Sequence, residues 1–231
     1  MTAIVLLPGM DGSGAFFADF AAALQARTLV VSYPPDIPLG YAELEDFVRR
    51  ALPADEPYIL VGESFAGPLA ISLASSALPA LKALVLVCTF AACPVPWLSR
   101  TVRALIASLP FWRTPIRLTS SILLGRFDTP ALRSQLQSAM RAVAPTVWRT
   151  RLREVLTVDV TSRLTRLAVP VLCLRASDDR VVQAAASEAI VRNVPNVRVV
   201  QIEGPHFLLQ ARPAQAAAAL RTFAQQCGIE L

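Results

Sequence analysis

Short, continuous apolar runs separated by helix-like segments are the feature that most constrains the fold of this chain. A half-exposed strand alternates apolar and polar residues, whereas an unbroken apolar run indicates a parallel strand that helices cover on both faces. We predict strands at residues 3–8, 28–34, 58–63, 82–90, 170–177 and 197–204. We predict helices at residues 16–26, 41–52, 65–78, 184–193 and 213–226. Strands that alternate with helices in this way predict a doubly wound α/β fold.

The segment between residues 94 and 159 interrupts this alternation. It contains helical patterns at residues 99–109 and 130–143, which are divided by prolines, and no run that is typical of a strand. A segment of this length is too long to be a plain loop in a compact domain. We therefore predict an α/β core made of residues 1–93 and 160–231, with residues 94–159 inserted as a mostly helical lid over one edge of the sheet.

The composition fits a protein with a large apolar core. The 231 residues are 54% hydrophobic, which suits one domain of this size. No apolar run reaches the roughly 18 residues that a membrane-spanning helix needs, and the start of the chain reads as a strand and not as a signal peptide. Four cysteines, at positions 88, 93, 173 and 227, show no metal-ligand spacing. We expect a cytoplasmic protein with reduced thiols, no membrane span, no metal and no cofactor.

The charge is unevenly distributed along the chain, whose net charge is +5. Residues 94–166 contain twelve arginines but only three acidic residues. Such a segment indicates either an anionic partner, such as an acidic acyl carrier, or a solvated face. Because Lys82 is the only lysine, arginine is the general cation of this protein, and we favour the solvated face. We expect no nucleic-acid partner, and the sequence does not indicate an oligomeric state.

The loops that follow the predicted strands hold the candidate site, because ligands of open α/β sheets bind beyond the carboxyl ends of the strands. After the first strand, Gly9 and Gly12 let the backbone approach a ligand, and the Met10 N–H can point at a developing oxyanion. After the third strand, Ser64 lies in a tight turn that nearly reads G-x-S-x-G, with Ala66 in place of the last glycine. The helix that begins there supplies the Phe65 N–H as a second donor. A serine that only capped this helix would explain less of the pattern.

His206, the only histidine, follows a Gly-Pro turn after the last predicted strand, on the same rim as Ser64. A serine needs an adjacent base to become a nucleophile, and the base needs an acid that fixes its tautomer. The acid must come from Asp178 or Asp179, which follow the fifth strand, and the pattern alone does not choose between them. The order serine, acid, histidine is the order of the α/β-hydrolases.

Four stretches, "LLPGMDGSG", "VGESFAG", "LRASDDRVV" and "EGPHFLLQARP", resemble the motifs of small capped bacterial esterases of the α/β-hydrolase superfamily, in the same order and at similar separations. The resemblance covers nearly the whole chain and is weakest in the lid. It implies that Asp179 is the acid, because Ala176, Asp179 and Val182 match the acid motif of that branch, while Gln183 stands where proline is frequent. It also implies six strands in the order two-one-three-four-five-six, because the two leading strands typical of the fold have no counterpart here.

We therefore predict a serine hydrolase that cleaves small or acyl-chain carboxylic esters through an acyl-enzyme, with Ser64, His206 and Asp179 as the triad. Met10 and Phe65 would form the oxyanion hole. The candidates for an apolar substrate pocket are Leu39, Phe90, Trp97, Phe111 and Trp112. Two alternatives stay open: a thioesterase or acyltransferase that acts on carrier-bound acyl groups, and a binding protein with the hydrolase fold but no catalysis.

Overall fold

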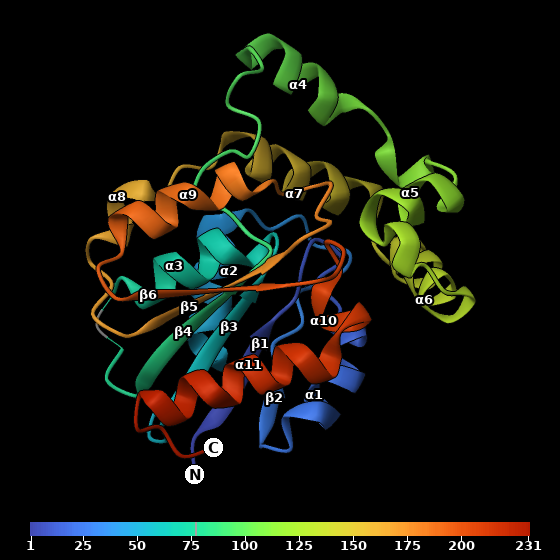
Figure 1. Cartoon of the computed structure of the whole chain (residues 1–231). Coiled ribbons are helices and arrows are strands. Elements are labelled where there is room, and N and C mark those ends of the chain that lie inside the picture. The colour runs from blue at the N-terminus through green and yellow to red at the C-terminus, as the bar shows by residue number, and fades with distance from the viewer. Residues whose placement is uncertain (77) are drawn as a thin grey trace.

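The computed structural model describes residues 1–76 and 78–231, and its centre is a six-stranded, all-parallel sheet (Figure 1). The strands run in the order β2-β1-β3-β4-β5-β6, which confirms the predicted order and the doubly wound fold. Their bounds are β1 Ala3–Leu7, β2 Thr28–Val30, β3 Tyr58–Glu63, β4 Leu81–Val87, β5 Val171–Ala176 and β6 Val197–Ile202. The carboxyl ends of all six strands therefore lie at one edge of the sheet.

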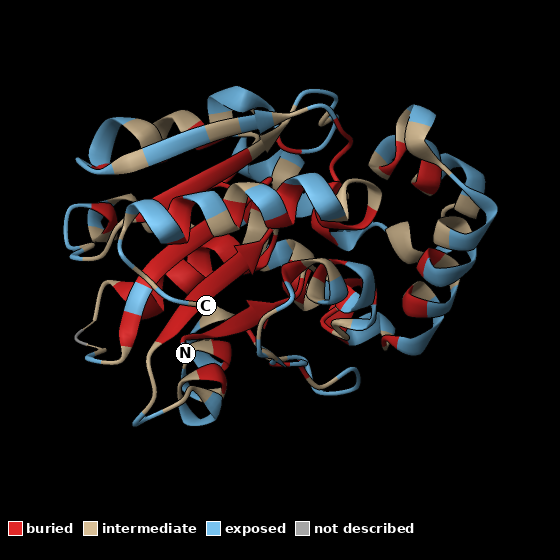
Figure 2. Ribbon diagram, turned by 60° about the horizontal axis from the view of Figure 1, so that its bottom comes forward, coloured by how far each residue is buried: buried red, intermediate tan, exposed pale blue. Residues whose placement is uncertain are grey.

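Helices cover both faces of the sheet, which explains why the central strands are apolar at nearly every position. In β1, Val5 and Leu7 face one apolar core, whereas Ile4 and Leu6 face the other. The first core packs beneath α2 (Tyr41–Ala51), α3 (Ala66–Ala74), α8 (Thr161–Leu164) and α9 (Ala184–Asn193). The second packs beneath α1 (Ala18–Leu24), α10 (Leu208–Ala211) and α11 (Pro213–Gln226). Figure 2 shows the resulting buried strands between partly exposed helices.

Several elements end earlier than predicted, for local reasons. The edge strand β2 pairs only with β1, and after Val30 the chain bends so that the Tyr33 N–H donates to the Gly12 carbonyl. The strand β4 stops at Val87 because Cys88 has a φ of 46°, which no extended strand allows. The helix expected to end at residue 78 ends at Ala74, and position 77 of that prediction lies outside the described residues.

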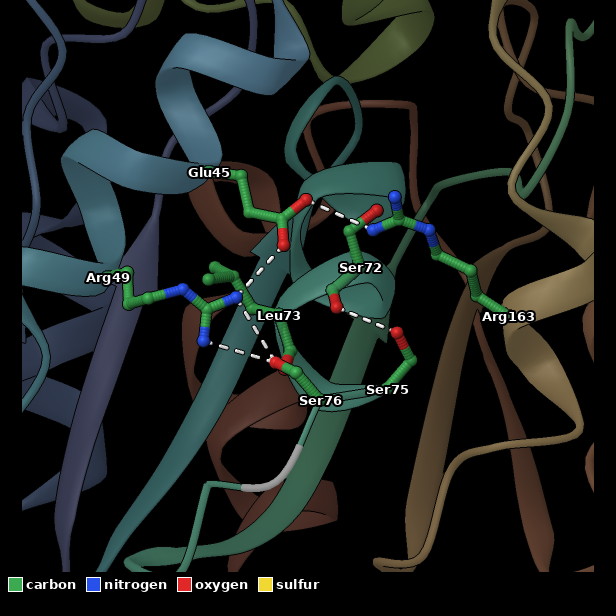
Figure 3. A network of polar contacts seen from close by, with 7 residues as sticks. All are labelled: Glu45, Arg49, Ser72, Leu73, Ser75, Ser76 and Arg163. Carbon is green, nitrogen blue, oxygen red and sulfur yellow. Dashed lines mark hydrogen bonds and ion pairs between the residues drawn. The ribbon is translucent and has the colours of Figure 1, made fainter.

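A polar network holds α2, α3 and α8 together on the first face (Figure 3). Glu45 on α2 accepts hydrogen bonds from Arg49, at 2.9 Å, and from Arg163 on α8, at 3.0 Å. Arg49 also donates to the Ser76 hydroxyl at 3.1 Å, just beyond α3. One arginine of the basic stretch, Arg163, thus forms an ion pair with Glu45 of α2.

The segment that interrupts the alternation is helical, with α4 Arg100–Ser108, α5 Ile116–Leu123, α6 Pro130–Ala142, α7 Pro145–Thr157 and two short 3-10 turns at Phe111–Arg113 and Gly125–Phe127. Pro130 and Pro145 occupy the first turns of α6 and α7, where the missing N–H costs nothing. An isolated antiparallel bridge between Ala92 and Asp159 joins the two ends of the segment. In Figure 1, α4, α5 and α6 extend away from the sheet, whereas α7 lies along it. The division into core and lid at residues 94 and 159 stays a prediction. Among the residues that the structure describes, no helix has the length and apolar content to cross a bilayer.

Candidate active site

Ser64 lies in a sharp turn between β3 and α3. Its φ of 51° is in the left-handed region, which costs a non-glycine residue energy and is typical of a nucleophile elbow. The turn depends on two close approaches. A Cβ on Gly67 would lie 1.9 Å from the Thr89 hydroxyl oxygen, and a Cβ on Gly62 would lie 2.7 Å from the Cβ of Ala70. Thr89 in turn donates a hydrogen bond to the Ser64 carbonyl.

Three side chains from separate strand ends form one hydrogen-bonded chain. The Ser64 Oγ lies 2.8 Å from Nε2 of His206, and Nδ1 of His206 lies 2.9 and 3.0 Å from the two oxygens of Asp179. These residues follow β3, β6 and β5, whose carboxyl ends meet at the same edge. The side chains of His206 and Asp179 are only 4% and 5% exposed, so water competes little for their hydrogen bond.

The two adjacent aspartates have different partners. Besides His206, the Asp179 carboxylate accepts the N–H groups of Val181 and Val182, at 2.8 and 2.7 Å, which orient it. Asp178 points to the surface, where the Ser177 hydroxyl and Arg126 hydrogen-bond to it and lower the pKa of its carboxyl. The structure therefore brings Asp179, and not Asp178, to the histidine.

Two backbone N–H groups are the candidate oxyanion donors: that of Met10, in the loop after β1, and that of Phe65, which follows Ser64 in the turn after β3. A turn in which the Gly12 N–H donates to the Gly9 carbonyl, at 3.1 Å, carries Met10, and Gly9 lies against the Ser64 side chain. Within the described part of the chain, neither the Met10 N–H nor the Phe65 N–H donates to another protein group. Both N–H groups are therefore available as donors.

Arg151 on α7 fixes this loop from the other side, and the sequence analysis did not identify it. Its guanidinium donates to the Met10 carbonyl at 2.8 Å and to the Pro34 carbonyl at 3.0 Å, and it lies over the ring of Tyr33. The side chain is 1% exposed, and burial lowers its pKa. Among the described residues no carboxylate forms an ion pair with it. In the sequence Arg151 is one of twelve arginines in a basic stretch, so only the tertiary contact distinguishes it.

Glu63, the last residue of β3, is a second site residue that the sequence analysis did not single out. Its carboxylate accepts from the Gln210 amide at 3.1 Å, and both side chains line the cavity beside Ser64. Burial raises the pKa of Glu63 from 4.5 to about 7, opposed by the Gln210 hydrogen bond and by the charge of nearby His206. A carboxylate at the end of an apolar run was its only signal in the sequence.

Ser64 and His206 open onto a cavity of about 310 Å³ between the sheet edge and the helices α5, α6 and α7. Its apolar wall is formed by Phe16, Phe111, Ile122, Leu123, Leu136, Ala139, Met140, Trp148, Val181 and Phe207. The lining includes the acidic residues Asp11 and Glu63, and no arginine or lysine among the described residues.

Of the five predicted pocket residues, the structure brings only Phe111 to this cavity. Leu39 packs against the first core, Phe90 is buried at 2% exposure, and Trp97 is 67% exposed. Trp112 packs edge-on against Phe111 and beneath Arg149. The prediction that the four other residues line the pocket is therefore wrong. The sequence shows that a residue is aromatic or aliphatic, but it does not show which way the side chain faces. Among the residues described, no cluster of three or more His, Cys, Asp or Glu side chains could hold a metal ion.

Comparisons with known proteins identify solved structures with a similar fold. By fold the chain is similar to a bromoperoxidase from Bacillus anthracis, at 16% identity and a TM-score of 0.85, over 97% of this chain and 92% of that one. It is also similar to a thermophilic esterase from Thermogutta terrifontis, at 19% identity and a TM-score of 0.82, over 98% and 90%. A third similar structure is the enol-lactonase from Burkholderia xenovorans, at 16% identity and a TM-score of 0.79, over 97% and 91%.

These identities show a shared fold and no more. No curated protein matches the sequence. The sequence model of the α/β-hydrolase family, however, matches residues 4–220, which is nearly the whole chain and includes every residue of the hydrogen-bonded chain at Ser64. The protein belongs to the α/β-hydrolase family.

Proposed function

We propose that this protein is a serine esterase that hydrolyses carboxylic esters with an uncharged, apolar acyl group. The observation that carries the proposal is the hydrogen-bonded chain from Ser64 through His206 to Asp179, which opens onto an apolar cavity. A serine hydroxyl at neutral pH needs such a base, and the base needs an acid on its other nitrogen.

The reaction follows from these positions. His206 Nε2 takes the proton from the Ser64 hydroxyl as the oxygen attacks the ester carbonyl. Asp179 holds Nδ1–H and stabilises the imidazolium that forms. The Met10 and Phe65 N–H groups donate to the oxyanion of the tetrahedral intermediate. His206 then protonates the leaving alcohol, and the acyl group stays on Ser64.

Water completes the cycle in the reverse sense. His206 removes a proton from a water molecule, which attacks the acyl-enzyme. The second tetrahedral intermediate then collapses to the acid, as the bond to Ser64 breaks and His206 returns the proton to the Ser64 oxygen. No group beyond those of this chain and water enters these steps.

The lining of the cavity supports the substrate class. A carboxylate on the acyl chain would meet the Asp11 carboxylate and no basic side chain other than His206 within the described lining, so it would be repelled and poorly solvated. An apolar chain would contact side chains such as Leu136, Met140 and Trp148 and would leave water. The carrier-bound thioester alternative stays a prediction, since no contact in the cavity favours it.

A pair of matched substrates tests the proposal. We expect the p-nitrophenyl ester of valerate to be hydrolysed at least tenfold faster, in kcat/KM, than the p-nitrophenyl monoester of glutarate, which has the same chain length and a terminal carboxylate; this corresponds to about 1.4 kcal/mol. Ser64→Ala should abolish both reactions, whereas Ser134→Ala, an exposed serine on α6, should change neither. Equal kcat/KM values for the two esters would refute the proposed substrate class. An active Ser64→Ala variant would refute the proposal that the protein is a serine esterase with Ser64 as its nucleophile.

A further inference from the structure

Exposed apolar side chains are concentrated in one short part of the chain. Twelve large apolar residues are exposed among those described, and six of them lie between residues 97 and 122. These six are Trp97, Val102, Leu105, Leu109, Leu118 and Ile122. Trp97 and Leu105 are 67% and 63% exposed. Single exposed apolar residues are common on protein surfaces, but a concentration of them in one segment indicates an interaction site.

The exposed residues form stripes on two amphipathic helices. Val102 and Leu105 lie at helical spacing on α4, and Leu109 follows directly after its end, while Leu118 and Ile122 lie at helical spacing on α5. The opposite side of α4 is already occupied: Ala107 is buried, and Arg103 donates to the Leu156 carbonyl of α7 at 3.0 Å. The apolar stripe is therefore the free side of a helix that is anchored on its other side.

The α5 stripe leads to the mouth of the catalytic cavity. Ile122, which is 43% exposed, also lines the cavity, and so does Val181, which is 39% exposed. Arg180 ties the two segments together by donating to the Ser121 carbonyl at 3.2 Å. The exposed apolar stripe of α5 thus reaches the entrance to Ser64.

The same segment carries positive charge without negative charge. Residues 94–127 contain five arginines and no aspartate or glutamate. Arg103 and Arg126 have partners within the protein, whereas Arg100, Arg113 and Arg117 are exposed and form no ion pair with any described residue. A helix that only faces water usually mixes both signs of charge, and this segment does not.

We propose that this lid surface, which comprises the six exposed apolar residues together with Arg100, Arg113 and Arg117, docks on an anionic lipid surface. Tryptophan and leucine side chains enter the boundary between headgroups and acyl chains, and arginines bind anionic headgroups. A second copy of this chain would bring arginines against arginines. An acidic protein would explain the arginines but not so many exposed apolar side chains. The inference goes beyond esterase activity, because docking requires no hydrolysis.

Vesicle co-sedimentation with the Ser64→Ala variant tests the proposal without lipid turnover. We expect binding to vesicles of phosphatidylcholine mixed with phosphatidylglycerol, weaker binding to phosphatidylcholine alone, and a loss of binding at high salt. Each arginine near an anionic surface contributes about fivefold in binding, so changing Arg100, Arg113 and Arg117 together to Gln should weaken binding by at least tenfold.

The matched control changes Arg50, Arg192 and Arg198 to Gln, because these exposed arginines lie outside the lid surface and remove the same charge. It should bind almost as the parent does. Trp97 provides a second readout, since its fluorescence should shift to shorter wavelength on anionic vesicles. That shift should be missing in Trp97→Phe.

Three results would overturn the proposal: no binding of the folded protein to anionic vesicles, equal weakening by the two arginine triples, or a Trp97 spectrum that vesicles leave unchanged. If the protein does not bind vesicles but self-associates, and Leu105→Glu abolishes the self-association, the surface is an interface for a second copy. Binding to an acidic acyl carrier without vesicle binding would assign it to a protein partner. Because every arm uses the inactive Ser64→Ala variant, the outcome is separate from that of the esterase proposal.

Discussion

Replacing Arg151 by methionine tests how α7 supports the chemistry. The change keeps a long side chain in the buried space but removes the donors to the carbonyls of Met10 and Pro34. The Met10 carbonyl belongs to the loop whose N–H group faces the Ser64 oxygen in the proposed mechanism. Without the guanidinium, this loop loses its tie to α7 and the N–H loses its fixed direction.

The expected effects on stability and on turnover differ in size. Two hydrogen bonds from a charged donor contribute about 1.5–3 kcal/mol each. Burying a guanidinium without an ion pair costs several kcal/mol, which the methionine no longer incurs. The two effects nearly cancel, so we expect the free energy of unfolding to change by about 2 kcal/mol or less. A misdirected oxyanion donor, by contrast, lowers kcat by about 10² to 10³.

Steady-state kinetics with a neutral p-nitrophenyl ester, together with thermal unfolding, distinguish these effects. We expect Arg151→Met to lower kcat and to leave KM nearly unchanged, because the oxyanion exists only in the transition state. Arg151→Lys should keep part of the activity, since one ammonium can reach only one carbonyl at a time. Arg153→Met, at an exposed position on the same helix, is the control and should behave as wild type. If Arg151→Met is folded and retains kcat within twofold of wild type, the positioning role is refuted.

Two further predictions concern the carboxylates of the site. Asp179→Asn should lower kcat/KM by several decades and Asp178→Asn by less than about threefold, because only Asp179 contacts His206. Steady-state kinetics that show equal losses for the two variants would contradict this. Glu63 favours its neutral form when folded, so its contribution to stability is complete below pH 4.5 and is lost as the pH rises through about 7. Denaturant unfolding should therefore show that wild type loses about 3 kcal/mol across this range relative to Glu63→Gln. In the pH profile of kcat/KM, Glu63→Gln should also remove the ionisation of Glu63, which lies beside the base. If the stability of Glu63→Gln depends on pH in the same way as that of wild type, the raised pKa of Glu63 is refuted.

The strands of the sheet were predictable because a strand that is buried on both faces has apolar residues at nearly every position. The runs at β1, β3 and β5 are apolar at nearly every position, so their order along the chain and their parallel direction follow from pattern alone. Ser64, His206 and the pair Asp178–Asp179 could be proposed for a related reason, since each follows a predicted strand and parallel strands bring their ends together. The choice of Asp179 within the pair came from the resemblance and not from the pattern.

The residues that shape the cavity were less accessible to prediction, because they depend on how the helices between residues 94 and 159 meet the rest of the chain. Arg151 looks like any other arginine until α7 is placed against the Met10 loop. Trp97 and Phe111 are both aromatic residues of the lid, yet one is exposed and the other lines the cavity. Periodicity tells which side of a helix is apolar, but it does not tell what that side contacts.

Trapping the acyl-enzyme tests the central claim most directly. After rapid mixing with a p-nitrophenyl ester and acid quench, intact-mass and peptide mass spectrometry should find one acyl group per chain, on the peptide that contains Ser64. The Ser64→Ala variant should show no adduct, and its turnover should fall by a factor on the order of 10⁴ to 10⁶ while its fold is retained. An acyl group on another residue, or a Ser64→Ala variant that keeps a substantial fraction of the activity, would contradict the assignment of Ser64 as the nucleophile.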